Sequence, residues 1–124
     1  MPRKKKDVIE TIALKISQLM LNKQAEDIKI MDVREVTPIT NFFINCSSGS
    51  HPQTKALSDY INDELKKDGV KPWHIEGLEN QEWILMDYVN IVVNIFSRKS
   101  RDYYNLERLW GDAVITEVKD EKTE

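Results

Sequence analysis

Residues 83–111 read WILMDYVNIVVNIFSRKSRDYYNLERLWG, and this stretch decides the fold prediction for the chain. Two apolar runs, 83–88 and 91–96, are separated only by Val89 and Asn90, so their natural pairing is a β-hairpin with a tight turn. The stretch also holds two of the three tryptophans and three of the four tyrosines. It carries no metal-ligand cluster and no phosphate-binding loop. This combination favours a surface that holds another protein over one that transforms a small molecule.

The first strand of this hairpin alternates between two environments. Trp83, Leu85 and Asp87 share one face, and the residues between them share the other. The aspartate predicts that the tryptophan face is partly wet, and the polar segment 79–82 gives the tryptophan a rim of acids and amides. A large aromatic anchor with a polar rim is the composition of a binding hot spot.

A helix is predicted after the hairpin, from Lys99 to Trp110, with Gly111 as its stop. Tyr103, Leu106 and Trp110 recur along it at helical spacing. Two interpretations stay open for these residues: they pack onto the sheet of their own chain, or they contribute to a binding surface.

The remaining segments complete an α/β pattern. The predicted elements are a helix over 7–22 that begins at Asp7, strands over 27–33 and 42–46, a helix over 50–69 capped by Ser50, and a strand over 71–76. Their connections imply a single domain with a mixed sheet of about five strands flanked by helices. Residues 1–6 are expected to be a flexible basic N-terminus, 7–113 the folded domain, and 114–124 a flexible acidic tail.

Length, cysteine usage and charge set further bounds. The 124 residues suffice for one domain that needs no disulfide or metal for stability. The single cysteine, the lack of a leader pattern and the lack of any run of ~20 apolar residues predict a cytoplasmic protein that does not enter a membrane. A net charge of −3 is not the basic footprint of a nucleic-acid binder, so no direct sequence-specific nucleic-acid binding is expected.

Enzyme chemistry finds little support in the sequence. None of the four glycines is spaced for a dinucleotide or Walker loop, and neither histidine has metal-ligand spacing. Cys46 and His51 invite a nucleophile-and-base hypothesis, but a buried thiol and an exposed imidazole explain them better. Gly49-Ser50 follows a strand and opens a helix, as in metal-dependent nucleotidyltransferases, yet the strands lack the paired carboxylates that such enzymes need. We therefore predict no catalytic residue, no cofactor and no metal site.

Several segments, taken in order, resemble the ribosomal silencing factor family, also called the Iojap-related family. The matching pieces are Asp32-Val33, Thr40 to Ile44, the serine-rich turn with Gln53, Glu76-Gly77, both hairpin strands, and the run 104–112 that contains Leu-Glu-Arg-Leu-Trp-Gly-Asp. The resemblance covers about residues 7–113. Two positions depart from the family pattern: Val89-Asn90 replaces a common Gly-Asp, and Asn94 replaces a common histidine.

The resemblance implies a nucleotidyltransferase-like fold without catalytic carboxylates and a regulator that is not an enzyme. Family members bind the large ribosomal subunit through ribosomal protein uL-fourteen and sterically block joining of the small subunit. This lowers translation when nutrients are short, and organelle members are linked to large-subunit assembly. Family members also form homodimers when free.

On this basis we expect a set of contact residues in which aromatics anchor the partner and acids pair with its Lys or Arg side chains. The set is Trp83, Asp87, Tyr88, Tyr104, Glu107 and Trp110. The alternatives that stay open are a metal-dependent nucleotidyltransferase, a large-subunit assembly factor and a bare dimerisation module.

Overall fold

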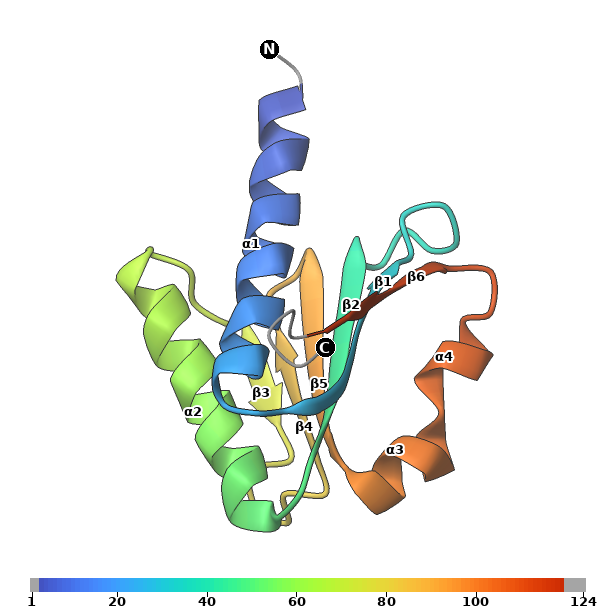
Figure 1. Ribbon diagram of the computed structural model, residues 1–124. Coiled ribbons are helices and arrows are strands. Elements are labelled where there is room, and N and C mark those ends of the chain that lie inside the picture. Colours follow the sequence, from blue (N-terminus) through green and yellow to red (C-terminus); the bar gives the residue numbers. More distant parts are fainter. Residues whose placement is uncertain (1–2, 120–124) are drawn as a thin grey trace.

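The structure, a computed structural model, describes residues 3–119 of the chain (Figure 1). Its elements, in chain order, are α1 (Arg3–Asn22), β1 (Glu26–Asp32), β2 (Phe42–Ser48), α2 (His51–Lys67), β3 (His74–Glu76), β4 (Trp83–Asp87), β5 (Ile91–Ser97), α3 (Arg98–Tyr104), α4 (Leu106–Leu109) and β6 (Val114–Val118).

All the strands belong to one six-stranded sheet in the order β3-β4-β5-β2-β1-β6. The central pair β2 and β5 runs parallel, and each of the other neighbouring pairs runs antiparallel. The predicted α/β class, the mixed sheet and the β4–β5 hairpin are therefore confirmed. The sheet has one strand more than the five or so that the sequence indicated.

Helices α1 and α2 cover one face of this sheet (Figure 1). Alternate strand residues such as Ile44, Ile84 and Val93 are fully buried beneath them. Helix α2 begins where predicted, because the Ser50 side chain accepts a hydrogen bond from the backbone N–H of Gln53 at 3.2 Å. This layer is the hydrophobic core, and burial of its aliphatic side chains is the main source of stability.

The opposite face of the sheet is only partly covered. The short helices α3 and α4 lie against it (Figure 1); α3 contacts β5 and β2, and α4 is joined to β2 by the hydrogen bond between Asn45 and Glu107. Along β4, the residues on this face, Trp83, Leu85 and Asp87, are each half-buried, whereas Ile84 and Met86 on the core side are buried. The predicted alternation of the first hairpin strand is thus confirmed.

The prediction of a flexible tail from residue 114 onward is wrong for residues 114–118. This segment forms β6, which pairs antiparallel with β1 from Asp32↔Val114 to Ile28↔Val118. Four of its five residues are exposed, so its side chains show no periodic burial pattern. Its order comes from main-chain pairing with a distant strand, which local composition does not reveal. Residues 120–124 lie outside the described part of the chain.

Two predicted helices also need correction. Helix α1 begins at Arg3, so Asp7 lies within it and does not begin it, and residues 3–6 are helical, in contrast to the flexible end that we predicted. Residues 1–2 lie outside the described part. The last helix is broken at Asn105, whose φ of 46° is left-handed and separates α3 from α4. Asparagine tolerates this conformation better than most residues do.

Candidate protein-docking site

Trp83 is the centre of an aromatic cluster on the partly covered face of the sheet. Its ring stacks on Phe96 of β5 at a centroid distance of 5.0 Å and meets Tyr104 of α3 at 4.5 Å. Phe96 is fully buried, whereas Tyr104 is 46 % exposed. We call Trp83, Phe96 and Tyr104 the aromatic cluster; it offers an apolar surface whose inner side is fixed in the fold.

A chain of buried amides holds the indole in place. The Trp83 Nε1–H donates to Oδ1 of Asn94 at 2.9 Å, and Asn94 Nδ2 donates to Oδ1 of Asn45 at 3.0 Å. Asn45 Nδ2 in turn donates to Oε2 of Glu107 at 3.0 Å. Asn45 and Asn94 are directly opposite each other on the parallel strands β2 and β5. Each amide thus satisfies its neighbour, which buried polar groups require.

The chain ends in a buried ion pair beneath α3 and α4. The Arg101 guanidinium is only 5 % exposed; it donates to Oε2 of Glu107 at 2.9 Å and to Oγ of Ser47 at 3.0 Å. Burial opposes ionisation of Glu107, but the Asn45 hydrogen bond and the Arg101 charge outweigh it and hold the pKa of this carboxyl below its usual value. The pair therefore ties both short helices to the sheet. We call Trp83, Asn94, Asn45, Glu107, Arg101 and Ser47 the polar network.

Helix α3 begins as soon as β5 ends. The Ser97 side chain caps the helix by accepting from the backbone N–H of Ser100 at 3.2 Å, and its hydroxyl donates to Glu82 at 2.7 Å. Glu82 also lies 3.0 Å from Nε2 of His51. The polar segment before Trp83, predicted as the rim of a binding surface, thus has a second role in anchoring α3.

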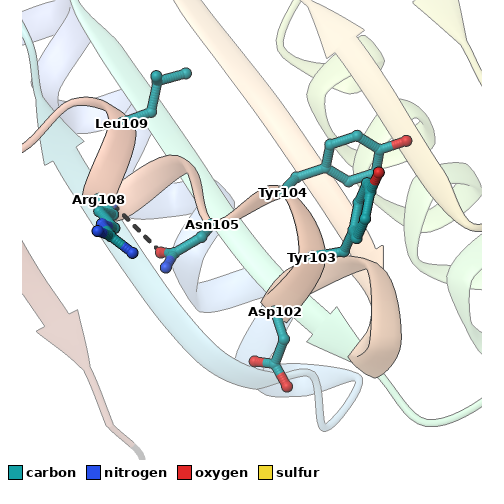
Figure 2. A pocket seen from close by; sticks show the side chains of 6 residues that line it. All are labelled: Asp102, Tyr103, Tyr104, Asn105, Arg108 and Leu109. Atoms are coloured by element: carbon teal, nitrogen blue, oxygen red, sulfur yellow. Dashed lines mark hydrogen bonds between the residues drawn. The ribbon is translucent and has the colours of Figure 1, made fainter.

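Trp110, the last of the predicted aromatic contact residues, lies at the C-terminal end of helix α4. The Trp110 ring, which is half-buried, meets Phe43 of β2 at a centroid distance of 5.5 Å. Side chains from α3, α4 and the intervening Asn105 line an open depression of about 470 Å³. Figure 2 shows how these side chains lie. The Asn105 side chain accepts from the backbone N–H of Arg108 at 3.3 Å there, while Tyr103 and Tyr104 lie side by side, edge to face.

The structure links three of the six predicted contact residues. Trp83 and Tyr104 touch, and Glu107 is joined to Trp83 through the polar network, whereas Trp110 packs on Phe43 of β2. Asp87 lies farther along the same face of β4, where its Oδ1 accepts from the backbone N–H of Val89 at 2.8 Å.

Tyr88 is separated from the other five. Its ring packs against the hydrophobic core beneath α1 and α2, on the far side of the sheet. Its hydroxyl oxygen is buried with no hydrogen-bond partner, and burial raises the pKa of this phenol to about 12. The Tyr88 side chain is therefore not on the proposed surface, and only its backbone, at the hairpin turn, can contribute there.

The sequence analysis missed the members of the polar network other than Trp83 and Glu107. Asn45 and Asn94 each interrupt an apolar run within a buried strand, and that interruption was the signal available. A buried amide needs a hydrogen-bond partner, so each asparagine indicated a buried polar contact without indicating which residue supplies it. Arg101 gave no signal, because an arginine in a short helix is ordinarily exposed.

The residues considered for enzyme chemistry are used structurally. Cys46 is fully buried, and burial raises the pKa of its thiol to about 12, while the His51 ring contacts Glu82. Within residues 3–119, no group of three or more His, Cys, Asp or Glu side chains is placed to hold a metal ion. In the same part of the chain, no helix has the length and apolar character needed to cross a bilayer.

Comparisons with known proteins agree with this architecture. The chain is 34 % identical over 97 residues to the ribosomal silencing factor RsfS of Bacillus subtilis, a match that covers 78 % of this chain and 82 % of that protein. It is 29 % identical over 106 residues to the chloroplastic protein Iojap of Arabidopsis thaliana, covering 86 % of this chain and 44 % of that protein.

A solved structure supports the same relationship. A crystal structure of a protein from Chromobacterium violaceum superposes with a TM-score of 0.76 at 28 % identity, covering 94 % of this chain and 95 % of that chain. The sequence profile of the family described as "RsfS: Ribosomal silencing factor during starvation" matches residues 5–124. The chain therefore belongs to the RsfS family of ribosomal silencing factors.

Proposed function

We propose that this protein docks on the large ribosomal subunit through ribosomal protein uL-fourteen and sterically blocks joining of the small subunit. Translation would thereby be repressed under nutrient limitation. The observation that carries the proposal is the aromatic cluster, held by the polar network on the sheet face that α1 and α2 leave free. Family membership supplies the biological setting.

The geometry suits a binding hot spot. The inner side of Trp83 is packed on Phe96 and its N–H is satisfied by Asn94, so little side-chain freedom remains to be lost on binding. Binding energy concentrates in rigid aromatic side chains of this kind, which are surrounded by groups that exclude water. Tyr104, which is 46 % exposed, adds apolar surface beside Trp83, and the half-buried Trp110 presents a second aromatic that packs on Phe43 of β2.

Charge supports a protein partner over bare RNA. The net charge of −3 complements a basic ribosomal protein and is repelled by phosphate. Asp87 shares the face of β4 that carries Trp83, which supports a role for it in pairing with a Lys or Arg of the partner. Glu107 acts as a positioning residue in the proposal, because its Oε2 already accepts from Asn45 and Arg101.

The proposal contains no covalent step and assigns no catalytic residue, cofactor or metal. In this role the protein is cytoplasmic, forms a homodimer when free and binds the ribosome through one face. A role in large-subunit assembly uses the same docking surface; it would appear as precursor particles that accumulate in cells lacking the protein.

The test is a sucrose-gradient assay of purified ribosomal subunits with and without the protein. Wild-type protein should co-sediment with large subunits and leave small subunits unjoined. Trp83→Ala should weaken large-subunit binding by about 2 kcal/mol or more, which is the hot-spot scale. Leu14→Ala is the matched control, since Leu14 is 61 % exposed on α1 and far from this face.

Equal binding of wild type and Trp83→Ala to large subunits would show that the aromatic cluster is not part of the interface. Full subunit joining at saturating wild-type protein would refute the proposed function itself. Circular dichroism and thermal melts of both variants verify that a loss of binding does not reflect unfolding.

A further inference from the structure

Three large apolar side chains from three separate loops converge at the turn of the β4–β5 hairpin. Ile39 is 76 % exposed, Trp73 75 % and Val89 57 %, and together with Thr40, Asp87 and Val92 they line a depression of about 290 Å³. Exposed hydrophobic residues scattered singly are ordinary, but a convergent apolar patch marks an interaction site. We call this set of six residues the hairpin-end patch.

The loops that carry the hairpin-end patch are held together by main-chain hydrogen bonds. The N–H of Trp73 donates to the carbonyl of Asp87 at 2.7 Å. The carbonyl of Asn90 accepts from Asn41 and Phe42, at 3.0 and 3.2 Å, which ties the loop bearing Ile39 to the hairpin turn. Binding at a surface that is already ordered costs less conformational entropy than binding at mobile loop tips.

The hairpin turn itself is strained in a way that the isolated fold does not explain. Val89 has a φ of 75°, and the N–H of Asn90 donates to the carbonyl of Tyr88 at 2.9 Å across it. This is a γ-turn with positive φ, which a β-branched residue adopts only under strain. More than half of the Val89 side chain faces solvent, so little packing within the chain offsets that strain. Strain of this kind points to a role outside the isolated fold.

We propose that the hairpin-end patch is a second contact region for the protein partner, which inserts an apolar side chain there beside a Lys or Arg that pairs with Asp87. The inference rests on the proposed docking function and extends it. Asp87 and Trp83 lie on the same face of β4, so one partner reaches both the patch and the aromatic cluster. The residues that line the depression include an acid and no Lys or Arg, which favours a protein segment over RNA.

The first test measures affinity for purified large ribosomal subunits. Trp73→Ala, Ile39→Ala and Val89→Asn should each weaken binding by about tenfold or more, the scale of losing one well-buried apolar contact. Asparagine keeps the left-handed conformation accessible at position 89 while it removes the apolar group. Leu14→Ala, at an exposed position of α1, the helix that covers the other face of the sheet, should leave affinity unchanged. Thermal melts show that the variants remain folded.

The outcomes separate the two proposals. Wild-type affinity for all three patch variants, combined with weak binding by Trp83→Ala, would overturn this inference and leave the proposed docking function standing. No binding by the wild-type protein would overturn both.

A second test identifies the class of molecule that occupies the patch. A photoreactive p-benzoylphenylalanine at position 39 should form cross-links to ribosomal protein when the protein is bound to large subunits. Cross-links to ribosomal RNA alone would overturn the assignment of a protein occupant. If the complex still forms but no cross-link appears, the hairpin-end patch is not a contact region.

Discussion

Gly77 lies so close to Trp83 that a Cβ added at Gly77 would sit 1.9 Å from the main-chain carbonyl oxygen of Trp83. The φ of Gly77 is also positive, at 89°. The loop between β3 and β4 therefore closes over the first residue of β4 only because position 77 has no side chain.

Replacement of Gly77 should consequently damage both stability and docking. Gly77→Ala should lower the free energy of unfolding by about 3 kcal/mol or more, because backbone strain adds to a clash with main-chain atoms. The matched control is Gly69→Ala, where φ is 78° but nothing lies within 4 Å of the added Cβ. Urea denaturation should show a loss of only about 1 kcal/mol there. Equal losses at both positions would contradict the steric argument.

Asn94→Ala should break the polar network at its centre. The variant leaves the Trp83 indole N–H without its acceptor and Asn45 without its donor, so we expect a loss of about 2 kcal/mol in unfolding free energy. The indole should also become more mobile, and large-subunit affinity should fall with it. Asn62→Ala on α2 serves as the control and should change stability by less than about 0.5 kcal/mol. Urea titration and tryptophan fluorescence quenching measure both effects.

The Glu107 carboxyl should make stability depend on acid pH. Its folded-state pKa is lowered, so its ionised form stabilises the fold. That contribution is complete above the unfolded pKa of about 4.3 and is lost as pH falls through the lower folded pKa. Glu107→Gln should therefore cost about 2 kcal/mol at pH 7, the scale of hydrogen bonds to charged groups. Its difference from wild type should shrink below about pH 4.

Denaturation curves across this pH range test the prediction, with Glu79→Gln in the exposed loop as the control. A difference between Glu107→Gln and wild type that stays constant from neutral to acid pH would show that the ion pair is not the cause.

Val89→Gly should stabilise the protein. Glycine removes the penalty of a positive φ at position 89, which outweighs its greater freedom in the unfolded chain, and the net gain should be about 1 kcal/mol. Val114→Gly is a matched control, because Val114 is similarly exposed but lies in strand β6, where glycine should destabilise by about 0.5–1 kcal/mol. A lower melting temperature for Val89→Gly would show that the turn is not strained.

The hairpin and its two faces could be predicted because each depends on residues that are close along the chain. The alternation of Trp83, Ile84 and Leu85 along β4 indicates which side chains face the core. A connection of only two residues between β4 and β5 favours antiparallel pairing of the two strands. Ser50 likewise capped α2 where its spacing from Gln53 indicated.

The candidate site was predictable only in part. Trp83 of the hairpin and Tyr104 of the last predicted helix touch, whereas Trp110 packs on Phe43 and Tyr88 falls on the core side of the sheet, as its even spacing from Ile84 and Met86 implies. The family resemblance led us to include Tyr88 among the contact residues, whereas alternation along the strand predicts that its side chain faces the core.

By itself, the sequence determined the class of the fold, the hairpin, the buried faces of the helices and the family, because periodicity, capping and local order of motifs are written along the chain. Only the tertiary structure decided that 114–118 adds a sixth strand beside β1, that Asn45 and Asn94 face each other, and that Arg101 of α3 and Glu107 of α4 form a buried ion pair against the sheet. These features depend on register between distant segments. Such register is set by packing of the whole sheet, which no local pattern encodes.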